Sequence, residues 1–295
     1  MKKLIKNNPL PAYFLLTFIV SWSGILIVAL FTGMPATSNF FNSKGPAALI
    51  PTLLGPPVVG LLMTGICHGR DGLYNLKSRF LNWRMNIAWY LMAMLAVPVA
   101  LSAILLVLSS FSDVYTPKII TEGNRLSLVI TGILTGLLGG GLFEEVGWTG
   151  FAVPELRKKY NITDTGLILG LFWGLWHFLP VWWGSGDING KTDWILFLPG
   201  LFSHYAVLMP FRVILVWLHD RTQSLIPVIL MHASLTAFIL FVLNISATGL
   251  PLFVYNACFS GVLFIAVAII TATDRKTGSK PSGSLQQKGS IQNVM

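Results

Sequence analysis

The chain is 295 residues long, and its composition excludes most classes of soluble protein. Hydrophobic residues make up 54% of it, charged residues only 11%, and the mean hydropathy is +0.70, whereas roughly a quarter of the residues in a soluble domain are charged. The formal net charge of +9 comes from 20 Lys and Arg against 11 Asp and Glu. These values predict a polytopic membrane protein whose basic residues face lipid headgroups, with the lipid bilayer and no nucleic acid as a partner.

Apolar runs of about 20 residues recur along the chain without the alternation that is typical of a transmembrane barrel. They predict an all-α membrane protein with about eight transmembrane helices, because backbone groups inside a bilayer must be hydrogen-bonded within each segment. In chain order the predicted spans are 10–33, 46–66, 87–110, 127–153, 165–183, 195–218, 225–247 and 252–273.

The distribution of basic residues predicts the orientation. Only four lie on the side opposite the N-terminus, so the positive-inside rule predicts that the N- and C-termini are both cytoplasmic. The chain then divides into a basic cytoplasmic N-terminus at 1–8, a transmembrane domain at 9–274 and a disordered cytoplasmic tail at 275–295. The four residues on the opposite side are Lys44, Lys118, Arg125 and Lys191.

Two adjacent carboxylates, Glu144 and Glu145, lie in the stretch GLFEEVGWTGF of the fourth predicted span. An ionisable group near the bilayer centre costs several kcal/mol, roughly 3 on insertion scales, unless it faces the bundle interior and finds partners. We therefore interpret the pair as functional. The alternative is that the span breaks at the glycines 139–141, so that both carboxylates reach water.

Two histidines are predicted at a similar depth. Glu144 and His177 each lie about 13 residues, or ~20 Å, from the cytoplasmic end of their helices, and His232 lies about 11 residues, or ~16 Å, from the end of its own. Three spans thus present a carboxylate and two imidazoles in one layer. By contrast, His204 belongs to no motif, and we expect it to be structural.

Such a layer permits hydrolysis in two ways. A buried Glu beside an imidazole can activate water, and a second imidazole can stabilise a tetrahedral oxyanion. Alternatively, Glu144, His177 and His232 could hold a divalent metal such as zinc, since two His and one carboxylate form a common catalytic set. Each proposed catalytic group has a potential orienter one helical turn away, with Thr149 near Glu145, Trp173 near His177 and Thr236 near His232.

These motifs resemble the CAAX-protease and bacteriocin-processing (CPBP) family of intramembrane endopeptidases, also called the Abi family. Its first motif, Glu-Glu-x-x-x-Arg within E-E-x-G-W-R-G-F-x-x-P-x-L, is matched by EEVGWTGFAVPEL, which begins at Glu144. Its second, Phe-x-x-x-His, is matched by WGLWH, which ends at His177. Its third, His-x-x-x-Asn, is matched by HASLT, which begins at His232. The resemblance extends over residues 127–240.

The resemblance implies a protease-like core at about 127–247 that cuts a peptide or a membrane-protein substrate in the plasma (inner) membrane of a prokaryote. Glu144 and His177 would activate water, His232 would be an oxyanion group or metal ligand, and Glu145 would be a supporting acid. It leaves the oligomeric state and the need for a metal open.

Three departures from the family pattern bear on the site. Thr149 stands where the family has Arg, which removes the cation that would pair with Glu145. Arg212, about 8 residues or ~12 Å inside the sixth span, is the candidate replacement, with snorkelling toward the surface as the alternative. Thr236 offers one hydroxyl donor in place of an amide's two. Trp173 in the Phe position keeps an aromatic wall.

The departures and the carboxylate pair also allow two other functions. A non-catalytic immunity or scaffolding protein on the same fold would need neither the Arg nor the Asn. A proton-coupled transporter could use Glu144 and Glu145 as a relay, although the sequence has no evident inverted repeat.

Overall fold

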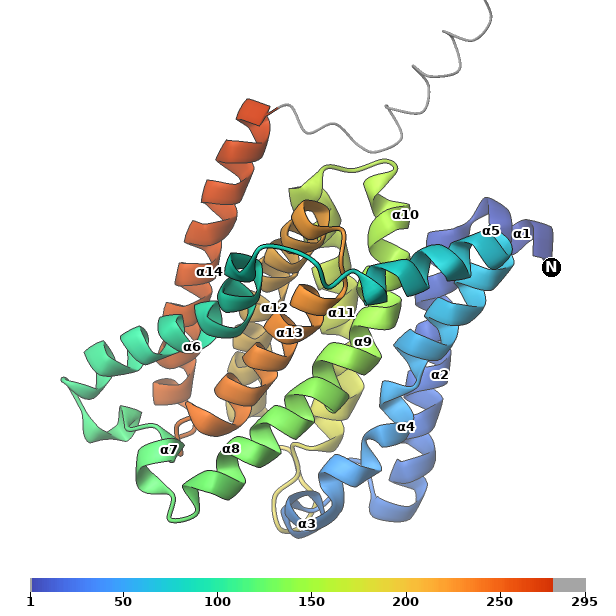
Figure 1. The fold of residues 1–295 in the computed structure, drawn as a ribbon. Coiled ribbons are helices and arrows are strands. Elements are labelled where there is room, and N and C mark those ends of the chain that lie inside the picture. The colour runs from blue at the N-terminus through green and yellow to red at the C-terminus, as the bar shows by residue number, and fades with distance from the viewer. Residues whose placement is uncertain (1, 278–295) are drawn as a thin grey trace, which may run out of the picture.

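The computed structural model describes residues 2–277, which are almost entirely helical (Figure 1). Seven described helical segments are long and apolar enough to cross a membrane, which confirms the all-α membrane fold. The predicted span at 225–247 is instead a shorter apolar helix at Ile226–Val242, whose length of ~25 Å is below the ~30 Å of a hydrocarbon core. The seven segments are Pro9–Thr32, Ser38–Leu81, Ile87–Ser109, Arg125–Arg157, Ile162–Trp183, Trp194–Thr222 and Leu250–Asp274.

Some of these segments consist of several shorter helical elements. Three of the described elements, η2, η3 and η4, are π-helical, and η1 is a 3-10 helix. In chain order the described elements are α1 (Lys2–Asn7), α2 (Pro9–Thr32), α3 (Ser38–Ala48), α4 (Ile50–Leu53), α5 (Gly55–Leu81), α6 (Ile87–Ser109), η1 (Asp113–Tyr115), α7 (Lys118–Thr121), α8 (Arg125–Leu134), η2 (Thr135–Leu142), α9 (Phe143–Gly147), η3 (Trp148–Ala152), α10 (Val153–Arg157), α11 (Ile162–Trp183), α12 (Trp194–Thr222), α13 (Ile226–Ala237), η4 (Phe238–Val242) and α14 (Leu250–Thr277).

The prediction ended the second span, 46–66, too early in the chain. Helix α5 continues to Leu81, with a kink at Gly69, where φ is +65° and ψ is −151°. Glycine adopts this conformation without the steric cost that a side chain would bring. Beyond the kink, the second half of α5 turns away from the direction of the first half and runs across one end of the bundle (Figure 1).

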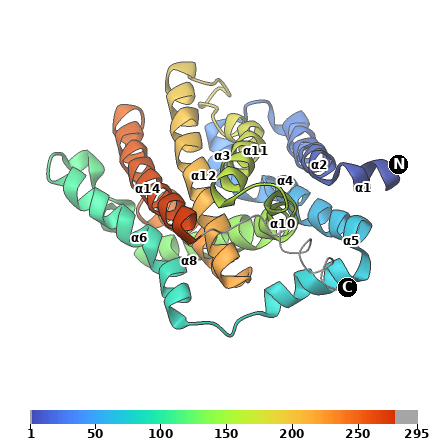
Figure 2. The same ribbon diagram turned by 90° about the horizontal axis from the view of Figure 1, so that it is seen from above.

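Helices α11 and α12 lie side by side in the centre of the bundle (Figure 2). Their backbones touch along a row of glycines on α11. A Cβ atom added at Gly166 would lie 2.4 Å from the Cα of Val213, and one at Gly170 would lie 2.8 Å from the Cα of Met209. Association inside a bilayer depends on close packing, so small residues are favoured at helix contacts.

The fourth span is held by glycines on two sides. A Cβ atom at Gly136 would lie 2.3 Å from the carbonyl oxygen of Ala233 on α13, and one at Gly147 would lie 2.2 Å from the carbonyl oxygen of Pro56 on α5. The segment that carries both glutamates is therefore pressed between two other helices.

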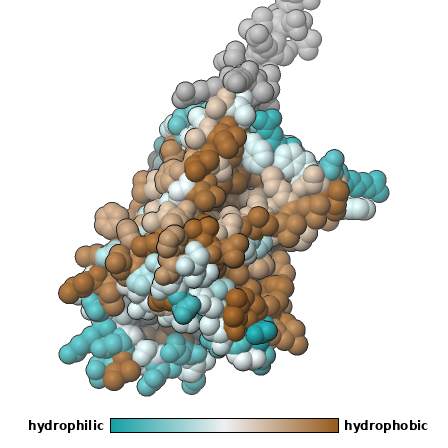
Figure 3. All heavy atoms as spheres, turned by 90° about the vertical axis from the view of Figure 1, so that its left-hand side faces the viewer, coloured by the Kyte–Doolittle hydropathy of each residue, from teal (hydrophilic) through white to brown (hydrophobic). Residues whose placement is uncertain are grey.

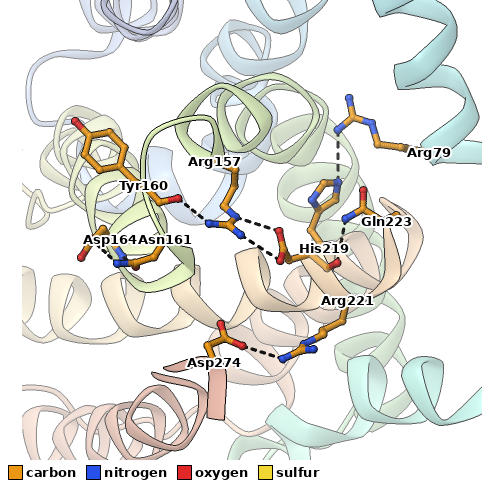
Figure 4. A network of polar contacts seen from close by, with 10 residues as sticks. Arg79, Arg157, Tyr160, Asn161, Asp164, His219, Arg221, Gln223 and Asp274 are labelled. Atoms are coloured by element: carbon orange, nitrogen blue, oxygen red, sulfur yellow. Dashed lines mark hydrogen bonds and ion pairs between the residues drawn. The ribbon is translucent and has the colours of Figure 1, made fainter. Parts of the chain in front are cut away.

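Polar contacts connect helices at the end of the bundle where α2 begins (Figure 4). Arg157 Nε donates to Asp220 Oδ1 at 3.0 Å, which joins α10 to α12. Arg221 Nη2 donates to Asp274 Oδ1 at 2.8 Å, which joins α12 to α14. These pairs lie near the ends of the spans, where charged side chains are accommodated at low cost.

The outer face of the bundle fits a membrane environment. On the side seen in Figure 3, hydrophobic residues form a broad area across the middle of the surface, and hydrophilic residues gather at its lower end. Large apolar side chains such as Leu106 (75% exposed) and Phe31 (85% exposed) face outward, which in a soluble protein would be an aggregation hazard. The chain is thus an integral membrane protein. Of the predicted tail, residues 275–277 continue α14, and 278–295 lie outside the described residues.

Replacing Gly166 with Ala should destabilise the bundle. The added methyl would collide with backbone atoms of α12, and overpacking of this kind costs about 1–3 kcal/mol. The matched control is Gly261→Ala on α14, where an added Cβ has no described atom within 4 Å. Thermal unfolding in detergent should show a lower Tm for Gly166→Ala and an unchanged or higher Tm for Gly261→Ala, since Ala favours helix. Equal Tm values would contradict the close contact.

Candidate active site

The two glutamates lie on α9, a short α-helical segment between the π-helical segments η2 and η3. Glu144 is 3% exposed and Glu145 is 0% exposed. The fourth span is therefore continuous through the glycines 139–141, with wide turns in place of a break, and both carboxylates are buried. Wide π turns occur frequently at functional sites because they rotate side chains out of the regular α-helical register.

Glu145 is held by three side chains. Arg212 Nη1 on α12 donates to both carboxylate oxygens, at 2.9 Å to Oε1 and 2.8 Å to Oε2. His232 Nδ1 on α13 lies 2.6 Å from Oε1. The Thr149 hydroxyl, one turn away on the same span, donates to Oε2. Burial of an ion pair costs free energy that these charge-assisted hydrogen bonds offset.

The predicted contact between Arg212 and Glu145 is present, and the alternative that Arg212 snorkels to the surface is wrong because the residue is 0% exposed. Its guanidinium carbon lies 4.0 Å from the centroid of the Trp173 ring. A desolvated cation over an indole face contributes about 2 kcal/mol. Arg212 therefore reaches, from α12, the carboxylate that an Arg at position 149 would have paired one helical turn away.

Trp173 does more than form an aromatic wall. Its indole Nε1 donates to Glu144 Oε2 at 2.5 Å, a bond that the family's Phe could not make. Its ring meets His232 edge-on with 5.1 Å between centroids, and His177 in the same way at 5.4 Å. One indole thus touches a carboxylate, two imidazoles and a guanidinium from four different helices.

His177 is oriented by its own helix. Its Nδ1 lies 2.8 Å from the carbonyl oxygen of Trp173. A carbonyl only accepts, so Nδ1 carries the proton and, in the neutral ring, Nε2 keeps a lone pair that can accept a proton. The ring also meets Trp176 edge-on at 4.7 Å between centroids.

His204, which the sequence offered no reason to place in the site, lies beside His177. The two rings meet edge-on with 5.3 Å between centroids, and no described residue is a hydrogen-bond partner of His204 Nε2. The sequence holds one signal for the position of His204, which is that it lies eight residues before Arg212 on the same face of α12. That signal places His204 in the site only if α12 is known to pack on α11.

Tyr13 on α2 is a second residue outside the motifs. It is 0% exposed, its ring meets Trp148 edge-on at 5.6 Å between centroids, and its hydroxyl would lie 2.5 Å from a Cβ added at Gly147. The first transmembrane helix therefore packs directly behind the glutamate segment.

Thr236 is the least connected of the predicted residues. No hydrogen bond joins it to His232 among the described contacts. The two do face a common point, however, because a Cβ added at Gly140 would lie 2.7 Å from Thr236 Oγ1 and 3.1 Å from His232 Nε2. Both polar atoms thus lie so close to Gly140 that a side chain at this position would collide with them.

The predicted metal ligands do not form a metal site in this arrangement. No group of three or more His, Cys, Asp or Glu side chains in residues 2–277 is arranged to hold a metal ion. Glu144 Oε2 accepts the Trp173 indole proton and His232 Nδ1 is engaged by Glu145, and these contacts orient both groups.

Comparisons with known proteins point to the same part of the chain. The family model described as "Type II CAAX prenyl endopeptidase Rce1-like" matches residues 125–238, which contain all three motifs. The chain is also 23% identical over 278 residues to "CAAX prenyl protease 2" of Methanococcus maripaludis. That match covers 92% of this chain and 96% of the relative.

The motif order, the buried carboxylates beside two histidines and both comparisons agree on one class of enzyme. Over residues 125–238 the chain is similar to the Rce1-like family of type II CAAX prenyl endopeptidases, and both comparisons support a protease.

Proposed function

We propose that the protein is an endopeptidase that hydrolyses a peptide bond with water activated by Glu144 and His177. The observation that carries this proposal is the Trp173 indole, which is hydrogen-bonded to Glu144 and packed against the rings of both His177 and His232. A carboxylate and two imidazoles gathered around one rigid ring support general acid–base catalysis at this position.

The proposed reaction begins with one water near Glu144 and His177 Nε2. Glu144 accepts a proton as the water oxygen attacks the scissile carbonyl carbon, which forms a tetrahedral intermediate. Glu144 then delivers that proton to the amide nitrogen as the C–N bond breaks, so that one water is consumed and a carboxylic acid and an amine are released. Within the described part of the chain Glu144 accepts a hydrogen bond only from Trp173, so its other oxygen is available for the water.

Glu145 takes a different role from Glu144. With Arg212 and Thr149 donating to it, Glu145 is a carboxylate, and it holds the His232 ring through Nδ1. His232 Nε2 and Thr236 Oγ1 both lie close to Gly140, and we assign them as the two groups that bind the oxyanion. Hydrogen-bond donors placed at such a position contribute about 10²–10³ in rate each.

Arg212 and Glu145 form an ion pair inside the cluster, with 2.8 Å between Arg212 Nη1 and Glu145 Oε2. An unpaired charge deep in a low-dielectric interior would be far more costly. This pairing explains why a cation is retained near Glu145 although position 149 is Thr.

The substrate we propose is a peptide or protein segment presented at the membrane. The names of the matching family and of the archaeal relative make a C-terminal prenylated CAAX peptide the first substrate class to test. We place the enzyme in the plasma membrane of a prokaryote with both termini in the cytoplasm, as the distribution of Lys and Arg favours.

Glu144→Gln should abolish peptide cleavage while the fold is retained. The amide keeps the shape and the bond from Trp173 but cannot accept the proton from water, and loss of a general base reduces rate about 10²–10⁴-fold. Glu155→Gln is the matched control, because Glu155 is also buried but pairs with Lys158 at 2.5 Å at the end of the span. Cleavage of a quenched fluorescent peptide by the purified protein measures both. Activity retained in Glu144→Gln would refute the assignment.

Arg212→Ala should impair both stability and activity more than Arg212→Lys does. Removing one partner of a buried ion pair costs about 3–5 kcal/mol because the other charge remains buried. Lys keeps the charge but not the bond to both oxygens. Introducing Thr149→Arg into the Arg212→Ala variant should restore part of the activity, since it returns the cation to the family's position.

The measurements for this series are Tm in detergent and kcat for peptide cleavage. Equal behaviour of Arg212→Ala and Arg212→Lys, with no recovery in the double variant, would show that the cation is not needed by Glu145.

A further inference from the structure

An apolar groove lies on the outer side of the bundle between α2 and α11, which are neighbours in Figure 2. Its volume is about 950 Å³. Its α2 wall extends from Leu10 to Leu26, and its α11 wall carries Ile168, Phe172 and Leu175. We name it the α2–α11 groove. It lies on the face of α11 that looks away from α12.

The groove is polar mainly at one end. Lys159 and Tyr160, which lie between α10 and α11, line it where α2 begins. Lys159 is exposed and forms no ion pair with a described residue, whereas the adjacent Lys158 pairs with Glu155 at 2.5 Å. A long apolar channel thus ends at one uncompensated cation at the level of the membrane surface, where basic residues attract anionic headgroups.

The groove is long enough for a lipid chain. From Leu10 to Leu26 it follows α2 for ~24 Å. The hydrocarbon core of a bilayer is ~30 Å thick, so the acyl chains of one leaflet extend about 15 Å and fit within this length.

We propose that the α2–α11 groove binds one anionic phospholipid, with an acyl chain along the groove and the phosphate at Lys159. The proposal commits to a membrane lipid because the groove faces the bilayer and its only basic lining residue lies at the headgroup level. It does not depend on the catalytic assignment.

A lipid in this position would support the wall of the active site from behind. Phe172 stacks on Phe14 of α2 with 4.0 Å between centroids, and Trp22 Nε1 donates to the carbonyl oxygen of Trp176 at 3.1 Å. Phe172 and Trp176 immediately precede Trp173 and His177 in the chain. Filling the groove therefore restrains the stretch of α11 that presents both site residues.

The test is native mass spectrometry of the full chain after delipidation, titrated with phosphatidylglycerol or phosphatidylcholine. We expect one retained phosphatidylglycerol per chain, bound roughly fivefold more tightly than phosphatidylcholine, as one lysine at an anionic headgroup would give. Lys159→Glu should remove that preference and leave phosphatidylcholine binding unchanged. Lys191→Glu, the same charge change in the loop between α11 and α12, should keep the preference.

A second pair of variants tests the apolar part. Ile19→Trp places a large ring in the middle of the groove and should abolish the retained lipid. Ile265→Trp, at an exposed position of α14 (63% exposed) outside the groove, should retain it. Ser23→Phe, at an exposed groove position, replaces Ile19→Trp if that variant is not monodisperse.

Three results would overturn the proposal. If Ile19→Trp and Ser23→Phe both retain the lipid, or if Ile265→Trp loses it to the same extent as they do, the lipid is bound non-specifically around the protein and not in the groove. Equal affinity for the two lipids, unaffected by Lys159→Glu, would remove the headgroup site. A change of oligomeric state in Ile19→Trp without loss of lipid would mean that a second copy of the chain covers the groove.

Discussion

The buried carboxylate of Glu145 is the constraint on which the rest of the site depends. It is fully enclosed and accepts from Arg212 on α12 and Thr149 on its own span, with His232 on α13 at hydrogen-bond distance. A carboxylate in a low-dielectric interior must keep such partners, because the cost of leaving it unpaired exceeds the gain from most single contacts. Three spans are thereby fixed relative to one another around one group. The second carboxylate, Glu144, lies outside this set of contacts and is the group that we propose for proton transfer.

Close backbone contact makes this arrangement possible. Gly166 and Gly170 bring α11 against α12, while Gly136 and Gly147 bring the glutamate segment against α13 and α5. Packing replaces the hydrophobic driving force that lipid does not provide. Adjacent residues on an α-helix point about 100° apart, so the two glutamates on α9 meet different partners, Glu144 on α11 and Glu145 on α12 and α13. The glycine contacts bring these partners within reach.

Two departures from the family motifs are compensated within the structure. Where Arg is missing at position 149, Arg212 provides a cation from another helix, and Thr149 still donates a hydrogen bond. Where Phe is replaced at position 173, the indole adds a hydrogen bond to Glu144 that a phenyl ring lacks. Thr236 has no comparable replacement among the described contacts. The site is therefore altered in its details while its charges remain paired, which is consistent with a working enzyme.

The sequence alone determined the membrane class, most of the spans and the identity of the titratable groups, because a bilayer admits few structures and few buried charges. The motifs also predicted that Glu144, His177 and His232 would converge, and the Thr at position 149 predicted that Arg212 supplies the cation for Glu145. Only the tertiary structure decided that Trp173 is the common contact of the site, that His204 and Tyr13 adjoin it, and that α5 extends past Gly69. These features depend on which faces of neighbouring helices meet. Helical periodicity specifies the residues on each face of a helix, whereas the rotation of one helix against another is set by long-range contacts that no local pattern contains.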